Sequence, residues 1–210
     1  LGDANADGGV AEIVAYNSDN GKAYVVNGAQ SLLNVFDVAE DGSFGSAEEI
    51  DIAQRMQAED ETFVYGDMTS VAVDPEHDRI AVALQDADYT KSGRVAVLNY
   101  DNEIIAIYTT GVQPDMITFT EDGRYILTAD EGEPRMGYGT GAEDPAGSVT
   151  VIDTQATENA VKIATFDSFS ASELAAKGVV FNDPDGDGIS LSAAEDLEPE
   201  YIAVKNMTAY

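Results

Sequence analysis

The chain has 210 residues, 44% of them hydrophobic, so it is long and apolar enough to bury a core. Its 40 acidic residues outnumber its 10 bases and give a formal net charge of -30, which argues against nucleic acid or an anionic membrane surface as a partner. The chain contains no cysteine, which excludes disulfides, a thiol nucleophile and thiolate metal sites.

A strand-turn-strand pattern recurs along the chain. Its first two strands are expected at 11–16 and 22–26, 70–73 and 79–83, and 116–119 and 124–128, and a fourth copy begins at 200–204. Third strands are expected at 32–38, 94–99 and 148–153, and fourth strands at 49–52, 104–107 and 162–166. Polar turns rich in Gly, Pro, Asn and Asp separate the first two strands of each copy. Repeats of four short strands are typical of a β-propeller.

The predicted fold class is therefore all-β, a β-propeller of four-stranded antiparallel blades forming an incomplete ring of about three and a half blades. We expect blades at 11–53, 67–109 and 114–166, an incomplete blade at 198–210, and an insert at 169–197. Propellers close with about four to eight blades, so the remainder of the ring, from further blades or a second chain, is an expected partner. A small open sheet is the alternative.

Two segments lengthen the repeat, around 54–65 and 169–197. Within the second, Ser170 to Gly178 is expected to form a short helix with Ser170 as its N-cap and Glu173 in its first turn. Both segments are candidate functional loops, and simple decoration is the alternative.

Acidic residues gather at one end of the predicted blades. The start of the first strand and the end of the second lie on the same face of a blade, so these acids should meet around one mouth of the central channel. Crowded carboxylates favour a bound cation, and oxygen ligands suit calcium or magnesium, with manganese or iron at an open position. Solvated loop acids are the alternative. The predicted ligands at this mouth are Asp115, Glu131, Glu133, Glu198 and Glu200.

A second acidic segment, from Asp183 to Gly188, matches the opening of a calcium loop. Asp183, Asp185 and Asp187 would bind the ion, although the twelfth position is Ala194 and the acid Glu195 comes one residue late. A flexible Asp/Gly loop is the alternative.

The available catalytic groups are few. The single histidine, His77, lies in a turn at the end of its blade away from the acidic mouth, which argues against a Ser-His-Asp triad. Metal-assisted hydrolysis of a charged substrate such as a phosphate ester remains, with Glu131, Glu198 and Arg135 as candidate catalytic residues. Arg135 is placed to hold an anion, and an ordinary salt bridge is its alternative role.

Several segments together resemble the choice-of-anchor I family of bacterial proteins. They are 67–73, 114–123, 130–134, 147–149 and 196–204, and they cover nearly the whole chain in the expected order. The resemblance implies a secreted or surface-anchored β-propeller of the kind described as alkaline phosphatase-like or similar to a mesenchyme-specific cell-surface glycoprotein. It also implies that Glu131, Glu133, Glu198 and Glu200 match the family's acidic signatures.

From these features we expect an extracellular, periplasmic or cell-surface protein without direct membrane insertion. We expect calcium, with a second divalent or iron ion as a further candidate. The leading hypothesis is a metal-dependent phosphoric ester hydrolase. A non-catalytic adhesion or matrix module stabilised by calcium is the alternative, and the sequence leaves open whether the protein is an enzyme.

Overall fold

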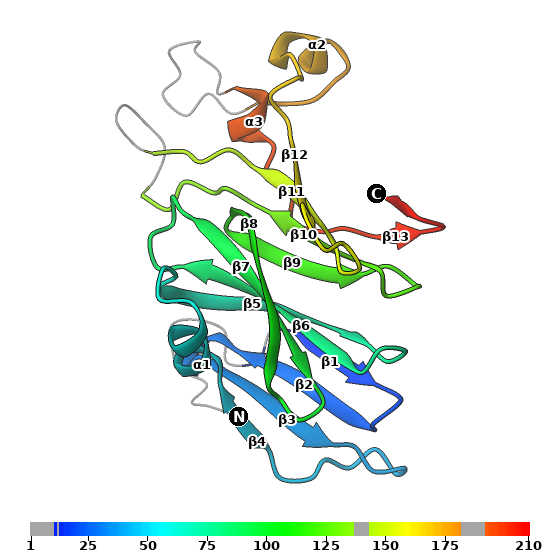
Figure 1. The fold of residues 1–210 in the computed structure, drawn as a ribbon. Coiled ribbons are helices and arrows are strands. Elements are labelled where there is room, and N and C mark those ends of the chain that lie inside the picture. Colours follow the sequence, from blue (N-terminus) through cyan, green and yellow to red (C-terminus); the bar gives the residue numbers. More distant parts are fainter. Residues whose placement is uncertain (1–10, 12, 137–142, 182–191) are drawn as a thin grey trace.

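The computed structural model describes residues 11, 13–136, 143–181 and 192–210, and these form three four-stranded antiparallel sheets and one hairpin. In each sheet the strands follow one another in chain order, so every sheet is a meander of the kind that forms a propeller blade. Figure 1 shows the sheets stacked one after another along the molecule, from blue through green to yellow. The predicted β-propeller fold class is confirmed.

The strands fall in three sets. Blade 1 contains β1 (Val14–Asn17), β2 (Lys22–Asn27), β3 (Leu32–Asp37) and β4 (Glu48–Asp51). Blade 2 contains β5 (Tyr65–Asp74), β6 (Arg79–Asp86), β7 (Ser92–Asn99) and β8 (Ile104–Val112). Blade 3 contains β9 (Pro114–Phe119), β10 (Tyr125–Asp130), β11 (Ser148–Asp153) and β12 (Val161–Thr165). The hairpin pairs β13 (Val204–Lys205) with β14 (Thr208–Ala209).

Helices occupy the connections. A 3-10 turn η1 (Gly28–Gln30) follows β2, and α1 (Ile52–Glu59) joins blade 1 to blade 2. Two short helices, α2 (Ala171–Ala176) and α3 (Ala193–Asp196), lie between blade 3 and the hairpin. The helix predicted after Ser170 is present as α2, and the Ser170 side chain accepts a hydrogen bond from the Glu173 backbone N–H as a cap should. Helix α1 was not predicted, because the segment was treated as a loop.

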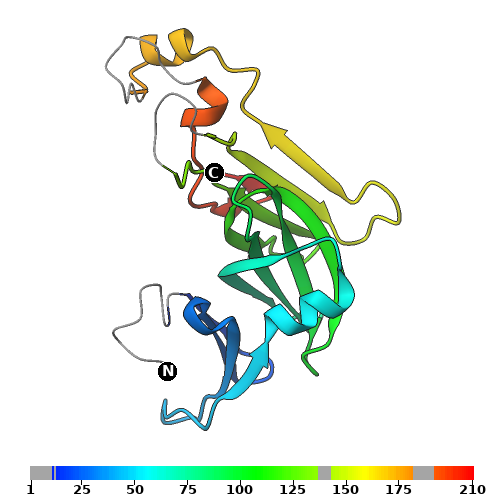
Figure 2. The same cartoon turned by 90° about the vertical axis from the view of Figure 1, so that its left-hand side faces the viewer.

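The strand alternation explains how the blades pack together. In β6, Ile80, Val82 and Leu84 belong to the apolar cluster shared by blades 1 and 2, whereas Ala81 and Ala83 belong to the cluster shared by blades 2 and 3. Successive side chains of a strand point to opposite faces, so one strand serves two interfaces. Figure 2 shows the resulting arc of sheets, seen from the side that carries α1.

The fourth repeat differs from the prediction in detail. A strand was expected from 200 to 204, but the structure assigns strand geometry only from Val204. Ile202 is nevertheless 5% exposed and packs with Met116, Leu127 and Ala129 of blade 3. This segment therefore contributes to the core as the inner strand of the next blade would.

Candidate functional site

The first strands of the repeats surround a common space, as the phase of the repeat predicts. A pocket of about 240 Å³ is lined by Ile13 and Val14 beside β1, 69–71 of β5, 115–117 of β9, and Glu200 with Tyr201 of the fourth repeat. Residues far apart in the chain thus meet at one channel. Two of its lining residues, Asp115 and Glu200, are predicted metal ligands.

Glu131 lies at the centre of an acidic group at one end of this channel. It directly follows β10, and its backbone N–H donates to the Gln113 carbonyl oxygen at 2.9 Å. Burial first, and then the charges of Asp115, Glu133 and Glu200, raise the pKa of Glu131 to about 7, against the opposing charge of Arg135. We call Asp115, Glu131, Glu133 and Glu200 the mouth acids. Four of the five ligands predicted at this mouth therefore interact electrostatically.

The fifth predicted ligand, Glu198, belongs to a neighbouring acidic group around Asp144. Burial first, and then the charges of Glu195, Glu198 and Asp196, raise the pKa of Asp144 to about 6. The two segments that carry these acids are joined by a hydrogen bond from the Gly147 N–H to the Ala194 carbonyl oxygen at 2.9 Å. A Cβ at Gly147 would lie 2.2 Å from the Leu197 carbonyl oxygen, so only glycine permits this approach.

In the described part of the chain, Arg135 donates its side-chain hydrogen bonds to amide oxygens. Its Nε donates to Gln113 Oε1 at 3.0 Å, and its Nη2 donates to Gln85 Oε1 at 2.7 Å. Gln113 in turn donates to the carbonyl oxygens of Tyr89 and Glu133, at 3.1 and 2.6 Å. Among the residues that the structure describes, Arg135 takes part in no ion pair within 4.0 Å. The guanidinium is thus fixed beside the mouth acids by neutral partners.

Asp67 extends the acidic region toward blade 1. It lies opposite Gln85 in the β5–β6 ladder, and its Oδ1 accepts from the Met68 N–H at 2.8 Å. Burial raises its pKa, which the Met68 hydrogen bond and then the Arg135 charge oppose. A Cβ at Gly28 would lie 2.6 Å from Asp67 Oδ1, so blade 1 approaches the carboxylate closely. Asp67 stands near the start of the first strand of its blade and Gly28 directly follows the second strand of blade 1, but the sequence analysis selected neither as a site residue.

Asp130 is the last residue of β10 and directly precedes Glu131, and its side chain is buried below the mouth. Its carboxylate accepts hydrogen bonds from the hydroxyls of Thr128 at 2.6 Å, Thr150 at 2.6 Å and Ser148 at 2.9 Å, and from the Gly111 N–H at 3.2 Å. The residue is completely buried, and this burial raises its pKa to about 6 against the effect of these donors. Sequence reasoning did not select Asp130, because its donors come from three strands and the β8–β10 contact depends on how blades 2 and 3 pack.

The side chains of this region are of the type that binds a hard cation, but those that the structure describes are not arranged as a metal site. Carboxylates that lie close enough for their charges to raise the pKa of Glu131 are a donor set suited to a hard cation. No group of three or more His, Cys, Asp or Glu side chains within the described ranges is arranged so that it could hold a metal ion. The other three predicted ligands, Asp183, Asp185 and Asp187, lie outside those ranges.

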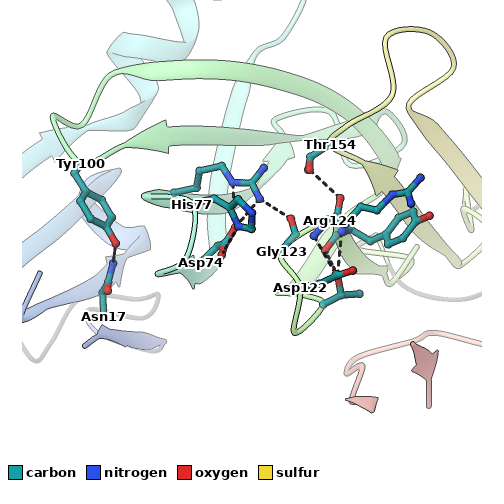
Figure 3. Close-up of polar contacts among 11 residues, drawn as sticks. Asn17, Asp74, His77, Tyr100, Asp122, Gly123, Arg124 and Thr154 are labelled. Atoms are coloured by element: carbon teal, nitrogen blue, oxygen red, sulfur yellow. Dashed lines mark hydrogen bonds and ion pairs between the residues drawn. The ribbon is translucent and has the colours of Figure 1, made fainter. Parts of the chain in front are cut away.

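The opposite end of the blades, which we call the turn face, has a different character (Figure 3). Asp74 is 4% exposed and accepts from His77 Nδ1 at 3.0 Å and from Arg79 Nε at 3.1 Å. Arg79 also donates to the Gly123 carbonyl oxygen of blade 3. His77 thus lies in a turn away from the mouth, as predicted, and its side chain, 43% exposed, is part of this contact between blades.

Comparison with known proteins gives one family and several distant folds. A model described as the choice-of-anchor I domain matches residues 12–210. No curated protein is similar enough to count as a match. Among solved structures, Kuenenia stuttgartiensis hydrazine synthase is 15% identical with a TM-score of 0.39, covering 73% of this chain and 53% of that one.

Two further solved structures have comparable scores. A nidogen/laminin complex is 12% identical with a TM-score of 0.45, covering 73% of this chain and 47% of that one. The β-propeller domain of Myceliophteria thermophila Cps50 (Swd1) is 15% identical with a TM-score of 0.41, covering 68% and 39%. The chain therefore spans about half the length of the hydrazine synthase and nidogen/laminin chains that it matches.

Proposed function

The chain belongs to the choice-of-anchor I domain family, and from this premise we propose that its channel mouth binds a divalent cation, with calcium as the first candidate. Domains of this family are associated with secreted and cell-surface proteins, where calcium is abundant. Across the ranges that the structure describes, no helix has the length and apolar character needed to cross a membrane.

The observation that carries the proposal is the convergence of the mouth acids from separate repeats. Asp115 comes from β9, Glu131 and Glu133 follow β10, and Glu200 comes from the fourth repeat. The charges of the other three mouth acids raise the pKa of Glu131, and a cation shared among the four would relieve this repulsion. The mouth acids would supply the oxygen ligands, and Glu198 is close enough in sequence to Glu200 to contribute.

Phosphoric ester hydrolysis is the catalytic form of this proposal. A bound divalent cation, or a second divalent or iron ion, would supply a Lewis acid that polarises a phosphoryl oxygen. Arg135 would orient the phosphate, since Gln85 and Gln113 fix its guanidinium beside Glu131. Glu131, the first carboxylate candidate, would hold a proton up to near neutral pH without the cation, in keeping with its pKa of about 7, and would release it when the cation binds. Glu198 is the second carboxylate candidate.

One contact favours a non-catalytic scaffold as the second candidate. The hydrogen bond from Gly147 to Ala194 joins the β10–β11 connection of blade 3 to the segment that leads into the fourth repeat. A cation held by Glu131 and Glu200 would bridge the same two parts of the chain and stiffen their junction. In this form the protein binds calcium for adhesion or matrix assembly and has no turnover.

Both the hydrolase and the scaffold require calcium to bind at the mouth, and calorimetric titration with calcium tests this. We expect Glu131→Gln to weaken calcium affinity about tenfold or more, since one buried ligand charge is lost. Glu121→Gln, a matched change of an exposed acid on the turn face, should leave the affinity unchanged. Equal affinities in the two variants, or no calcium binding by the parent protein, would refute the proposal.

A panel of phosphate esters then separates the two forms. Metal-dependent phosphate release that is lost on Arg135→Met supports hydrolysis. Calcium binding without release of phosphate from any ester supports the scaffold.

A further inference from the structure

A cleft of about 540 Å³ lies on the α1 side of the molecule, between that helix and the segment 60–65 that leads into β5. Its volume falls within the range of about 300–1,000 Å³ that is typical of small-molecule sites. We infer that this cleft binds a neutral saccharide. The insert that forms it is the first of the two segments that lengthen the repeat, and the calcium proposal does not use it. The cleft is lined by Asp51, Ala53, Gln54, Gln57, Glu61, Phe63, Val64 and Tyr65.

The helical wall of the cleft is held firmly in place. Asp51 caps α1, its side chain accepting from the Gln54 N–H at 2.8 Å. Ile52 and Met56 are fully buried in the core between blades 1 and 2, and they anchor the helix from beneath. The lining residues Gln54 and Gln57 are one turn apart and exposed, so their amides are available on the cleft side.

The opposite wall is fixed by contacts to blade 2. Asp60 accepts from Arg94 Nε at 2.8 Å, and the Arg94 guanidinium lies over the Phe63 ring, 5.2 Å from its centroid. The Val64 N–H donates to Asp86 Oδ2 at 3.2 Å, and the Val64 carbonyl oxygen accepts from the Ala87 N–H at 2.8 Å. Both walls are therefore present before any ligand arrives, which lowers the entropic cost of binding.

The chemistry of the lining selects the ligand class. The carboxylates of Asp51 and Glu61 accept hydrogen bonds, and the amides of Gln54 and Gln57 both donate and accept them. Hydroxyl groups also do both, so a polyol can pair with all four side chains.

The remaining lining supplies apolar surface and no positive charge. Val64 is 59% exposed, and with the half-buried Tyr65 it offers a surface for the C–H face of a sugar ring, while Phe63, 4% exposed, packs behind it. None of the residues that line the cleft is Lys or Arg, and two are acids, which disfavours an anionic ligand. The balance of polar acceptors, amides and apolar surface thus fits a neutral sugar better than a phosphate or a uronic acid.

Saccharide binding can be tested separately from calcium binding by working in EDTA. Saturation-transfer NMR followed by calorimetry would use maltotriose, cellotriose and triacetylchitotriose as probes, with sialyllactose and spermidine as anionic and cationic comparisons. We expect at least one neutral trisaccharide to bind. Its affinity should fall about tenfold in Gln57→Ala and in Glu61→Gln, the effect of losing one or two hydrogen bonds.

The variants are chosen to leave folding undisturbed. Gln57 lies on an exposed helix position, where alanine is the best helix former. The matched control is Gln155→Ala, an exposed glutamine in the β11–β12 turn, which should bind the sugar as the parent does. The inference would be overturned if none of the neutral sugars bound, or if Gln57→Ala and Gln155→Ala bound the sugar equally well. A preference for spermidine or sialyllactose that Glu61→Gln alters would also overturn it.

Discussion

The two ends of the blades use their charged residues in opposite ways. On the turn face, Arg124 pairs with Asp153 at 2.8 Å, and the side-chain hydrogen bond from Arg124 lowers the pKa of Asp153. On the mouth side, burial raises the pKa of Asp67, Asp130, Glu131 and Asp144. Acids paired with bases hold one end of the structure together, whereas burial raises the pKa of acids at the other end, where we propose that a cation binds.

The repeat places one basic residue of each blade on the turn face. Lys22, Arg79 and Arg124 stand at the beginning of the second strand in their blades, or directly before it. Each pairs with an aspartate of its own blade, namely Asp37, Asp74 and Asp153. Because a second strand starts on the turn face, this repeated position concentrates positive charge there. In this way the repeat places three of the chain's 10 bases on the turn face, each paired with an aspartate.

Breaking the buried pair on the turn face should have the largest effect. Arg79→Met keeps much of the contact with the Phe119 ring but leaves Asp74 buried without its guanidinium. We expect the free energy of unfolding to fall by about 3 kcal/mol, since removing one partner strands a buried charge. Urea denaturation would measure it.

The matched control for that change is Arg124→Met. Arg124 and Asp153 are 44% and 22% exposed, so this pair should contribute about 1 kcal/mol or less. Similar losses in the two variants would show that burial does not distinguish the pairs.

On the mouth side the contrast can be tested through pH. The pKa of Asp130 is about 6 in the folded protein, above its ordinary value, so its contribution to stability is complete below about pH 4 and is lost as pH rises through 6. The parent should lose about 2–3 kcal/mol of stability over this interval through Asp130. Asp130→Asn should remove that part of the slope, leaving the parts from Glu131 and Asp144.

Urea denaturation of both proteins at several pH values, in EDTA, would measure the difference. The same pH slope in Asp130→Asn and the parent would contradict the assignment of a raised pKa to Asp130.

The smallest expected effect concerns a neutral contact on the turn face. Asn17 is completely buried, and its Nδ2 donates to the Tyr100 hydroxyl of blade 2 at 2.7 Å (Figure 3). Tyr100→Phe should lower the free energy of unfolding by about 1 kcal/mol, because the Asn17 amide loses its acceptor. Thermal unfolding would detect this as a lower midpoint. Tyr210→Phe, at an exposed tyrosine, is the control and should not shift it.

Local sequence was sufficient for the strands and for the phase of the repeat. The turn residues and the alternation of apolar positions placed the strands of all three blades. Asp115 and Glu200, which the phase puts at one mouth, line one pocket, and their charges act on Glu131. Helix α1 was missed although its signals were present: Asp51 precedes the helix as a cap, and Ile52 and Met56 have helical spacing. A long insert was assumed to be loop, and that assumption outweighed the pattern.

Contacts between blades were beyond local reasoning. Arg135 was assigned an anion or a salt bridge, whereas its partners Gln85 and Gln113 lie 50 and 22 residues away in sequence. The network of Asp130 likewise depends on the register that sets Thr128 opposite Thr150. Such pairings follow from how sheets pack, and a single sequence does not specify them.

Strand β6 packs against blade 1 with one face and against blade 3 with the other, and this makes the blades non-interchangeable. The strand presents Ile80, Val82 and Leu84 to one neighbour but Ala81 and Ala83 to the other, so its two sides have different volumes. A duplicated or transplanted blade 2 would set small alanine side chains against a surface shaped for larger ones and leave voids. The different side-chain sizes on the two faces of β6 therefore determine which blade can pack on each side of blade 2.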